Sequence, residues 1–215
     1  MAVSDAAGFW SVAERWPGKI AVIDHDGTAH TFGELRDRVN QISNLFTSAG
    51  MRSGDHAAYM LSNGVEVFAV SLSLLQIGVY YTPLNYHLTP DEIACVLRDS
   101  GARLFIGDAA FADRSKGAAD RAQLSLSGRF AIGDVPTFVD IRRRACSQSA
   151  ASPPDRTPGA TLIYTSGTTG APKGILRPRP RTFEDAATVA EKGAKKYGWT
   201  SDVTYLVQGP LYHSG

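Results

Sequence analysis

Short apolar segments that alternate with helix-start signals are the feature that most constrains how this chain can fold. Two capping-box sequences, Thr31-Phe-Gly-Glu34 and Thr89-Pro-Asp-Glu92, each begin a run with helical periodicity. The apolar segments have the length of strands and lie at residues 20–23, 56–61, 79–82, 104–106, 130–132 and 161–165. Strands that alternate with helices predict an α/β fold, in which helices cover both faces of a mostly parallel sheet.

The ends of three helices can also be predicted. The helix that follows Thr31 should stop near Gly50, and the helix that follows Thr89 should end around Ser100. Residues 182–197 form a third candidate, with Thr182 as the N-cap and Gly198 as the stop. These boundaries leave the last predicted strand, residues 161–165, directly before a segment of different chemistry.

That segment completes the run Thr161-Leu-Ile-Tyr-Thr-Ser-Gly-Thr-Thr-Gly-Ala-Pro-Lys-Gly174, which passes from β-branched residues to hydroxyls and glycines. Glycines let the backbone approach a ligand closely, so that amide N–H groups can point at anionic oxygens. The hydroxyls add donors, and Lys173 adds a compact positive charge. The composition suits a phosphate-binding loop, and open α/β sheets place their ligands at the carboxyl ends of strands.

Two other interpretations of this run fit its residues less well. A Walker A loop has glycine before its lysine and serine or threonine after it, whereas Pro172 and Gly174 flank Lys173 here. Pro178 and Pro180 would also break a helix that began at Lys173, which excludes that class. A plain polar turn accounts for isolated glycines but poorly for this density of hydroxyls, glycines and a lysine.

The run from Tyr164 to Gly174 resembles the signature of the adenylate-forming, or AMP-binding, superfamily, which includes acyl-CoA synthetases, luciferases and peptide-synthetase adenylation domains. Other segments resemble the family in the same order. They are Ala13-Glu-Arg-Trp-Pro17 with Ala21-Val-Ile-Asp24, Tyr81-Thr-Pro-Leu-Asn85 with Leu88-Thr-Pro-Asp-Glu92, and Pro210-Leu-Tyr-His-Ser-Gly215.

The resemblance implies a two-step reaction in which a carboxylate attacks ATP to give an acyl-adenylate, and a thiol, usually of coenzyme A, then takes the acyl group. Donors around the departing pyrophosphate, together with Mg²⁺, would stabilise the first transition state. The residues that match the signature inherit this ATP-binding role; they are Thr165, Ser166, Gly167, Thr168, Thr169, Gly170 and Lys173.

His213 matches the family position that lies beside the substrate carboxylate in acyl- and aryl-CoA synthetases. Taken alone, a histidine at this place is more often a surface or core residue. Amino-acid-activating members carry an aspartate in this region, and none occurs from Leu206 to Gly215. The resemblance therefore favours a simple carboxylic or fatty acid as substrate, and it offers no catalytic residue within this chain.

The composition excludes several classes of function. Lys and Arg number 22 against 21 Asp and Glu, so the net charge of +1 provides no field for nucleic acid or an anionic membrane. Cys95 and Cys146 have neither metal-ligand nor disulfide spacing, and no signal peptide or membrane span is evident. A cytoplasmic protein is expected. The triple arginine at 142–144 is read as solvated surface, and residues 142–159 as a flexible linker.

Family members are more than twice as long as this chain, so the resemblance implies an N-terminal portion of the adenylation domain, inactive alone. The adenine, ribose and magnesium ligands and the adenylation lysine would lie elsewhere. An alternative is a non-catalytic α/β module that binds phosphate or a partner. Uncovered apolar surface would favour self-association into an oligomer. After Gly174, the run Ile-Leu-Arg-Pro-Arg-Pro-Arg181 departs from the family pattern, and its arginines are expected to face solvent.

Overall fold

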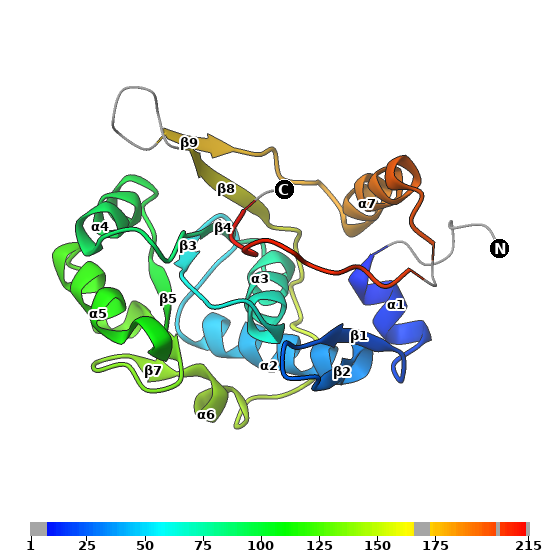
Figure 1. Ribbon diagram of the computed structural model, residues 1–215, viewed down its shortest axis with the longest axis horizontal. Helices are drawn as coiled ribbons and strands as arrows, with labels where there is room; N and C mark the ends of the chain where they lie inside the picture. The colour runs from blue at the N-terminus through cyan, green and yellow to red at the C-terminus, as the bar shows by residue number, and fades with distance from the viewer. Residues whose placement is uncertain (1–7, 166–172, 201–202, 214–215) are drawn as a thin grey trace.

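The protein is an α/β structure in which the central sheet has seven strands in the described part of the chain. The computed structural model describes residues 8–165, 173–200 and 203–213. The strand order is β7-β6-β5-β3-β4-β8-β9, and every neighbouring pair except β8 and β9 is parallel (Figure 1). The strands are β3 (His56–Tyr59), β4 (Tyr80–Pro83), β5 (Leu104–Asp108), β6 (Arg129–Ile132), β7 (Val139–Asp140), β8 (Ala160–Thr165) and β9 (Lys173–Leu176). The predicted mostly parallel sheet is therefore confirmed.

A separate antiparallel pair, β1 (Ile20–Ile23) and β2 (Ala29–Thr31), lies outside this sheet. The sequence predicted β1 as a strand but gave no sign of β2. The two strands are joined by a turn in which Asp24 accepts the N–H of Gly27 at 2.9 Å and donates its own N–H to Thr28 at 2.9 Å. Gly27 has a φ of 85°, a backbone conformation that glycine adopts without steric cost.

Helices cover both faces of the large sheet, because alternate strand residues point to opposite sides. Tyr59 and Ile106 pack into one cluster with α2 and α3, whereas Met60 and Phe105 pack into the other with α4 and α5. The described helices are α1 (Phe9–Arg15), α2 (Phe32–Ser48), α3 (Val65–Gln76), α4 (Pro90–Asp99), α5 (Ala112–Arg121), α6 (Ile141–Ala145) and α7 (Phe183–Tyr197). None of the helices in the described ranges is both long and apolar enough to cross a membrane.

The predicted caps are present. Thr31 and Thr89 accept the N–H groups of Glu34 and Glu92, and each glutamate side chain accepts the N–H of its threonine in return. These contacts lower the pKa of Glu92 through the Thr89 backbone N–H. Thr182 caps α7 in the same way with Asp185, and Gly198 ends it in the left-handed conformation with a φ of 67°.

The central strand β3 marks the place where the chain changes sides of the sheet. Its crossover helix α3 lies in the cluster on one face, while α4 and α5, which follow the neighbouring strands β4 and β5, lie in the cluster on the other. Loops that leave adjacent parallel strands toward opposite faces open a crevice at the carboxyl ends of those strands, where α/β proteins bind ligands. The fold thus points to the carboxyl end of β3.

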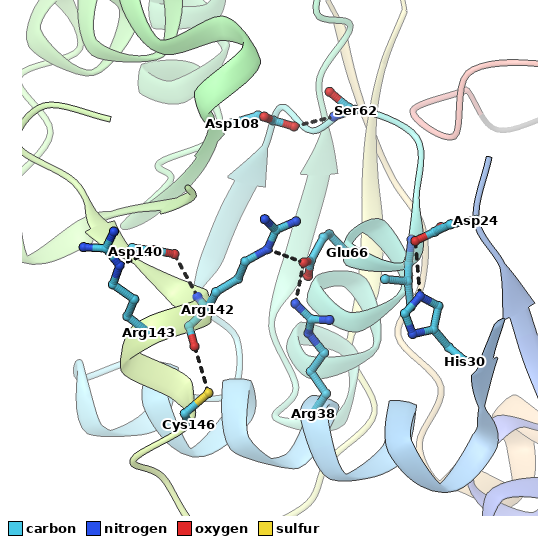
Figure 2. Close-up of polar contacts among 11 residues, drawn as sticks. Asp24, His30, Arg38, Ser62, Glu66, Asp108, Asp140, Arg142, Arg143 and Cys146 are labelled. Carbon is cyan, nitrogen blue, oxygen red and sulfur yellow. Dashed lines mark hydrogen bonds and ion pairs between the residues drawn. The ribbon is translucent and has the colours of Figure 1, made fainter. Parts of the chain in front are cut away.

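The segment expected to be a linker, residues 142–159, begins within α6 and is held against the sheet domain. Arg142 donates its Nε–H to Glu66 at 2.8 Å, and Arg38 pairs with the same carboxylate oxygen (Figure 2). Asn44 donates to the carbonyls of Ser149 at 2.8 Å and Ala151 at 3.0 Å. Within the triple arginine, Arg142 is consequently part of a structural ion pair. The domain boundaries predicted from the sequence stay a prediction.

Arg179 corrects the expectation that the arginines after Gly174 face solvent. Its guanidinium donates to Ser53 Oγ at 2.8 Å and to the carbonyl of Gly78 at 3.0 Å. It also lies 5.9 Å from the centre of the Tyr80 ring. The arginine is held because the end of α3 presents a carbonyl to it, a partner separated by 101 residues that local sequence cannot reveal.

Candidate functional site

The predicted phosphate loop lies between two paired strands. β8 ends at Thr165 and β9 begins at Lys173, and these two residues are partners in the antiparallel register (Figure 1). The candidates Ser166, Gly167, Thr168, Thr169 and Gly170 lie outside the described residues, and of Thr165 only the backbone is described. Because β8 pairs in parallel with β4, the loop starts at the carboxyl edge of the sheet, as predicted.

The base of this hairpin is fixed by Tyr164. Its hydroxyl donates to Asp99 Oδ2 at 2.5 Å, at the end of α4, and its ring packs against the core cluster of that face. Burial, followed by the hydrogen bond to Asp99, raises the pKa of Tyr164. Gly174 passes this ring so closely that a Cβ there would lie 3.1 Å from Tyr164 Cζ. A larger residue at 174 would push the ring or the strand aside.

Lys173 stands at the second end of the loop, and its side chain is exposed. It takes part in no ion pair within the described part of the chain, so its charge is free for an incoming anion there. The strand β9 follows it directly. A helix would follow the lysine of a Walker A loop, so the structure agrees with the exclusion of that class.

The segment that carries His213 lies against the loops that follow β3 and β4. Asn63, in the loop after β3, donates its amide to the carbonyl of Gly209 at 3.1 Å and accepts the N–H of Leu211 at 2.9 Å. Tyr86, in the loop after β4, meets Tyr212 edge to face with ring centres 5.0 Å apart. His213 itself is exposed, with its ring 4.6 Å from that of Tyr212.

Asp108 links the end of β5 to the loop that follows β3. It is the last residue of β5, and its Oδ2 accepts the N–H of Ser62 at 2.9 Å (Figure 2). Its Oδ1 accepts the N–H of Ala110 at 2.9 Å. Sequence reasoning missed Asn63, Tyr86 and Asp108, although each follows a predicted strand closely and could have been found from that position.

The described residues contain no group of three or more His, Cys, Asp or Glu side chains that could hold a metal ion. Two cavities formed by the described residues lie away from the carboxyl edge of β3 and β4. One is lined by the loops before β5 and β6, and the other lies between α1, α3 and α7. Besides the single carboxylate of Asp108, the described part of this edge presents backbone, amide, aromatic and lysine groups, which can bind a phosphate.

Comparison with known proteins identifies the family of this chain. Residues 9–215 match the family model described as AMP-binding enzyme. The chain therefore belongs to the AMP-binding enzyme family, the class whose signature the hairpin carries.

Individual relatives are acid–CoA ligases. The chain is 30% identical over 212 residues to feruloyl-CoA synthase of Amycolatopsis sp, covering 96% of this chain and 39% of the relative. It is 31% identical over 204 residues to 2-succinylbenzoate–CoA ligase of Geobacillus sp. (strain WCH70), covering 92% and 36%. The chain thus spans less than two fifths of the length of these curated relatives.

Solved structures of acid–CoA ligases have the same fold as this chain. The o-succinylbenzoate CoA synthetase of Bacillus subtilis, in complex with its acyl-adenylate intermediate, matches with a TM-score of 0.72 and 26% identity, over 95% of this chain and 50% of that chain. The same enzyme in complex with ATP and magnesium matches with a TM-score of 0.70 and 26% identity, over 95% and 51%. That enzyme therefore binds ATP, magnesium and its acyl-adenylate intermediate.

Proposed function

We propose that the whole protein is an ATP-dependent acid–CoA ligase, which joins a carboxylic acid to AMP and transfers the acyl group to coenzyme A. The observation that carries the proposal is the hairpin with the adenylate-forming signature, which leaves the carboxyl edge of the sheet with Lys173 opposite Thr165. A family match over residues 9–215, with acid–CoA ligases among the relatives, supports it.

The hairpin supplies the phosphate-binding part of the reaction. Lys173 is exposed and outside the described ion pairs, so it can approach the β- and γ-phosphates of ATP without losing a partner. We assign the hydroxyl and backbone donors of Thr165, Ser166, Gly167, Thr168, Thr169 and Gly170 to the same phosphates. Negative charge grows on the pyrophosphate as it departs, and donors fixed in advance stabilise that charge more than the charge of bound ATP.

Magnesium is a cofactor expected from the resemblance, and it would neutralise the polyphosphate when bound. The described part of this chain does not offer a set of three or more carboxylate, histidine or cysteine ligands for it.

His213 is assigned to the acid substrate. Asn63 and Tyr86 hold its segment over the crevice beside the central strand, and the exposed imidazole can donate a hydrogen bond to a carboxylate there. The curated relatives named above act on organic acids, feruloyl and 2-succinylbenzoate groups, and so favour a carboxylic acid as substrate.

The decisive experiment is ATP–pyrophosphate exchange by the whole protein with a panel of short-chain, long-chain and aromatic acids. We expect exchange that depends on one class of acid. Addition of coenzyme A should then give the thioester of that acid. An exchange that requires an amino acid would move the protein to another branch of the family. The absence of exchange with every acid, in protein that binds ATP, would favour the alternative of a non-catalytic phosphate-binding module.

A further inference from the structure

The cavity between α1, α3 and α7 lies away from the proposed active site and contains an arginine that forms no ion pair with any described residue. It has a volume of about 390 Å³, and its walls are mainly apolar, with Phe9, Leu72, Leu75 and Ala187 among them. Figure 1 shows α7 beside α1, and a Cβ built on Gly8 would lie 3.9 Å from that of Ala187. Ligand pockets usually measure about 300–1,000 Å³, so this one suits a small molecule.

Arg156 is held in this cavity by two aromatic rings. Its guanidinium carbon lies 4.3 Å from the centre of the Trp10 ring and 4.5 Å from that of Phe183. The next residue, Thr157, is fixed because its N–H donates to the carbonyl of Gln76 at 3.0 Å. The two rings are nearly perpendicular, at 80° with centres 6.5 Å apart, so they adjoin the guanidinium on two neighbouring sides. The guanidinium N–H donors form no hydrogen bond within the described residues, which leaves them for a ligand.

The charge of Arg156 is uncompensated within the described ranges. No carboxylate there forms an ion pair with it, Glu184 in the cavity wall included, and its Nε is buried without a hydrogen-bond partner. Burial lowers the pKa of Arg156, which reflects the cost of a desolvated charge. Arg156 is partly buried, so its unpaired charge is only partly solvated, and a bound anion would offset that loss of hydration.

We propose that this cavity is a second ligand site, which binds a small amphipathic monocarboxylate with its carboxylate on Arg156 and its apolar body against α1, α3 and α7. The guanidinium fork matches a carboxylate through two parallel hydrogen bonds. One cation balances one negative charge, and the apolar walls offer nothing to the second charge of a phosphate monoester. The site involves neither the phosphate hairpin nor His213, so it stands independently of the proposed reaction.

The test is a titration of the protein with octanoate, followed through the fluorescence of Trp10. Trp10→Phe keeps an aromatic ring and identifies the part of the signal that comes from the cavity. Octanoate should produce a saturable change that Trp10→Phe abolishes. The neutral analogue 1-octanol, which lacks the charge, should bind at least about tenfold more weakly. This comparison needs no variant of Arg156.

The matched substitutions are Arg156→Met and Arg15→Met. Arg15 also stacks on a tryptophan, at 4.9 Å from the Trp16 ring centre, but it does not line the cavity. Arg156→Met should weaken octanoate binding by at least about tenfold, and Arg15→Met should leave it unchanged. Equal binding of octanoate and 1-octanol would show only apolar adsorption and would overturn the proposal. Octanoate binding by Arg156→Met with wild-type affinity would also overturn it, as would the absence of a Trp10 signal at millimolar octanoate.

Discussion

Replacement of Asn63 by alanine tests whether the loop after β3 positions the segment that carries His213. The amide of Asn63 bridges that segment, because it donates to the carbonyl of Gly209 and accepts the N–H of Leu211. Alanine removes both hydrogen bonds and adds no new group. The segment should then leave the crevice more often, while the sheet beneath it stays folded.

The size of the effect follows from the two lost bonds. A net hydrogen bond contributes about 0.5–1.5 kcal/mol, and exposed bonds fall at the lower end. Asn63 is exposed, so the pair should hold the segment by about 1–2 kcal/mol, which is a factor of about 5–30 in its open population. Contacts of Leu211 with the core and of Tyr212 with Tyr86 remain, so the segment should loosen without being lost.

Amide hydrogen exchange resolved by residue measures this opening. The N–H of Leu211 loses its acceptor directly, so the informative amide is that of His213, whose acceptor is the carbonyl of Pro210 at 3.1 Å. In the Asn63→Ala protein the exchange of His213 should accelerate by about 5- to 30-fold. Amides of β5 and β6 should keep their wild-type rates.

Asn44→Ala is the matched control, because Asn44 also uses its side-chain amide for two backbone hydrogen bonds, to Ser149 and Ala151. That variant should accelerate exchange around residue 150 and leave His213 unchanged. If His213 exchanged equally fast in the wild type and Asn63→Ala, the assignment of Asn63 as a positioning residue would be refuted.

Two further predictions concern ion pairs. Glu66→Gln leaves Arg38 and Arg142 without their shared carboxylate, and since the residue is 8% exposed, urea titration should show about 1–3 kcal/mol lost from the free energy of unfolding. Asp37→Asn, which breaks a half-exposed pair with Arg36, should cost at most about 1 kcal/mol, and equal losses would contradict the argument. Hydrogen bonds from Lys116, then from Arg129, lower the pKa of Asp120 below its usual 3.8. A lowered folded-state pKa stabilises the protein above the unfolded pKa, and this contribution is lost as the pH falls through the folded pKa. The stability difference between the wild type and Asp120→Asn, followed by urea titration across pH, should therefore be full at neutral pH and shrink as the pH falls below 3.8. A difference that did not shrink with falling pH would contradict this assignment.

Features that depend on neighbouring residues could be predicted from the sequence, and features that depend on distant residues could not. The caps at Thr31, Thr89 and Thr182 involve partners three residues away, so the three helix starts were predicted correctly. The carboxyl-edge position of the hairpin followed from the strand pattern in the same way. The link between Asn63 and residues 209–211 spans 146 residues or more, and only the folded chain brings these groups together.

The same distinction explains why the expectation of solvent exposure was wrong for Arg179, whereas Arg177 and Arg181 are exposed as predicted. Alternation predicted that these side chains share a face, but not that Gly78 and Tyr80 would lie beneath Arg179. Arg156 was likewise hidden, because its stacking partners Trp10 and Phe183 come from opposite ends of the chain. Periodicity reports which side chains lie on one face of an element, while the partner of that face depends on the order of the strands.

The most direct test of the central claim compares ATP–pyrophosphate exchange by the whole protein with exchange by its Lys173→Ala and Lys192→Ala variants. Lys192 is an exposed lysine on α7 and serves as the control. If the hairpin binds the phosphates that leave, Lys173→Ala should slow exchange by about 10- to 100-fold through the loss of a charge-assisted hydrogen bond, and Lys192→Ala should not. Exchange by Lys173→Ala at the wild-type rate would contradict the account.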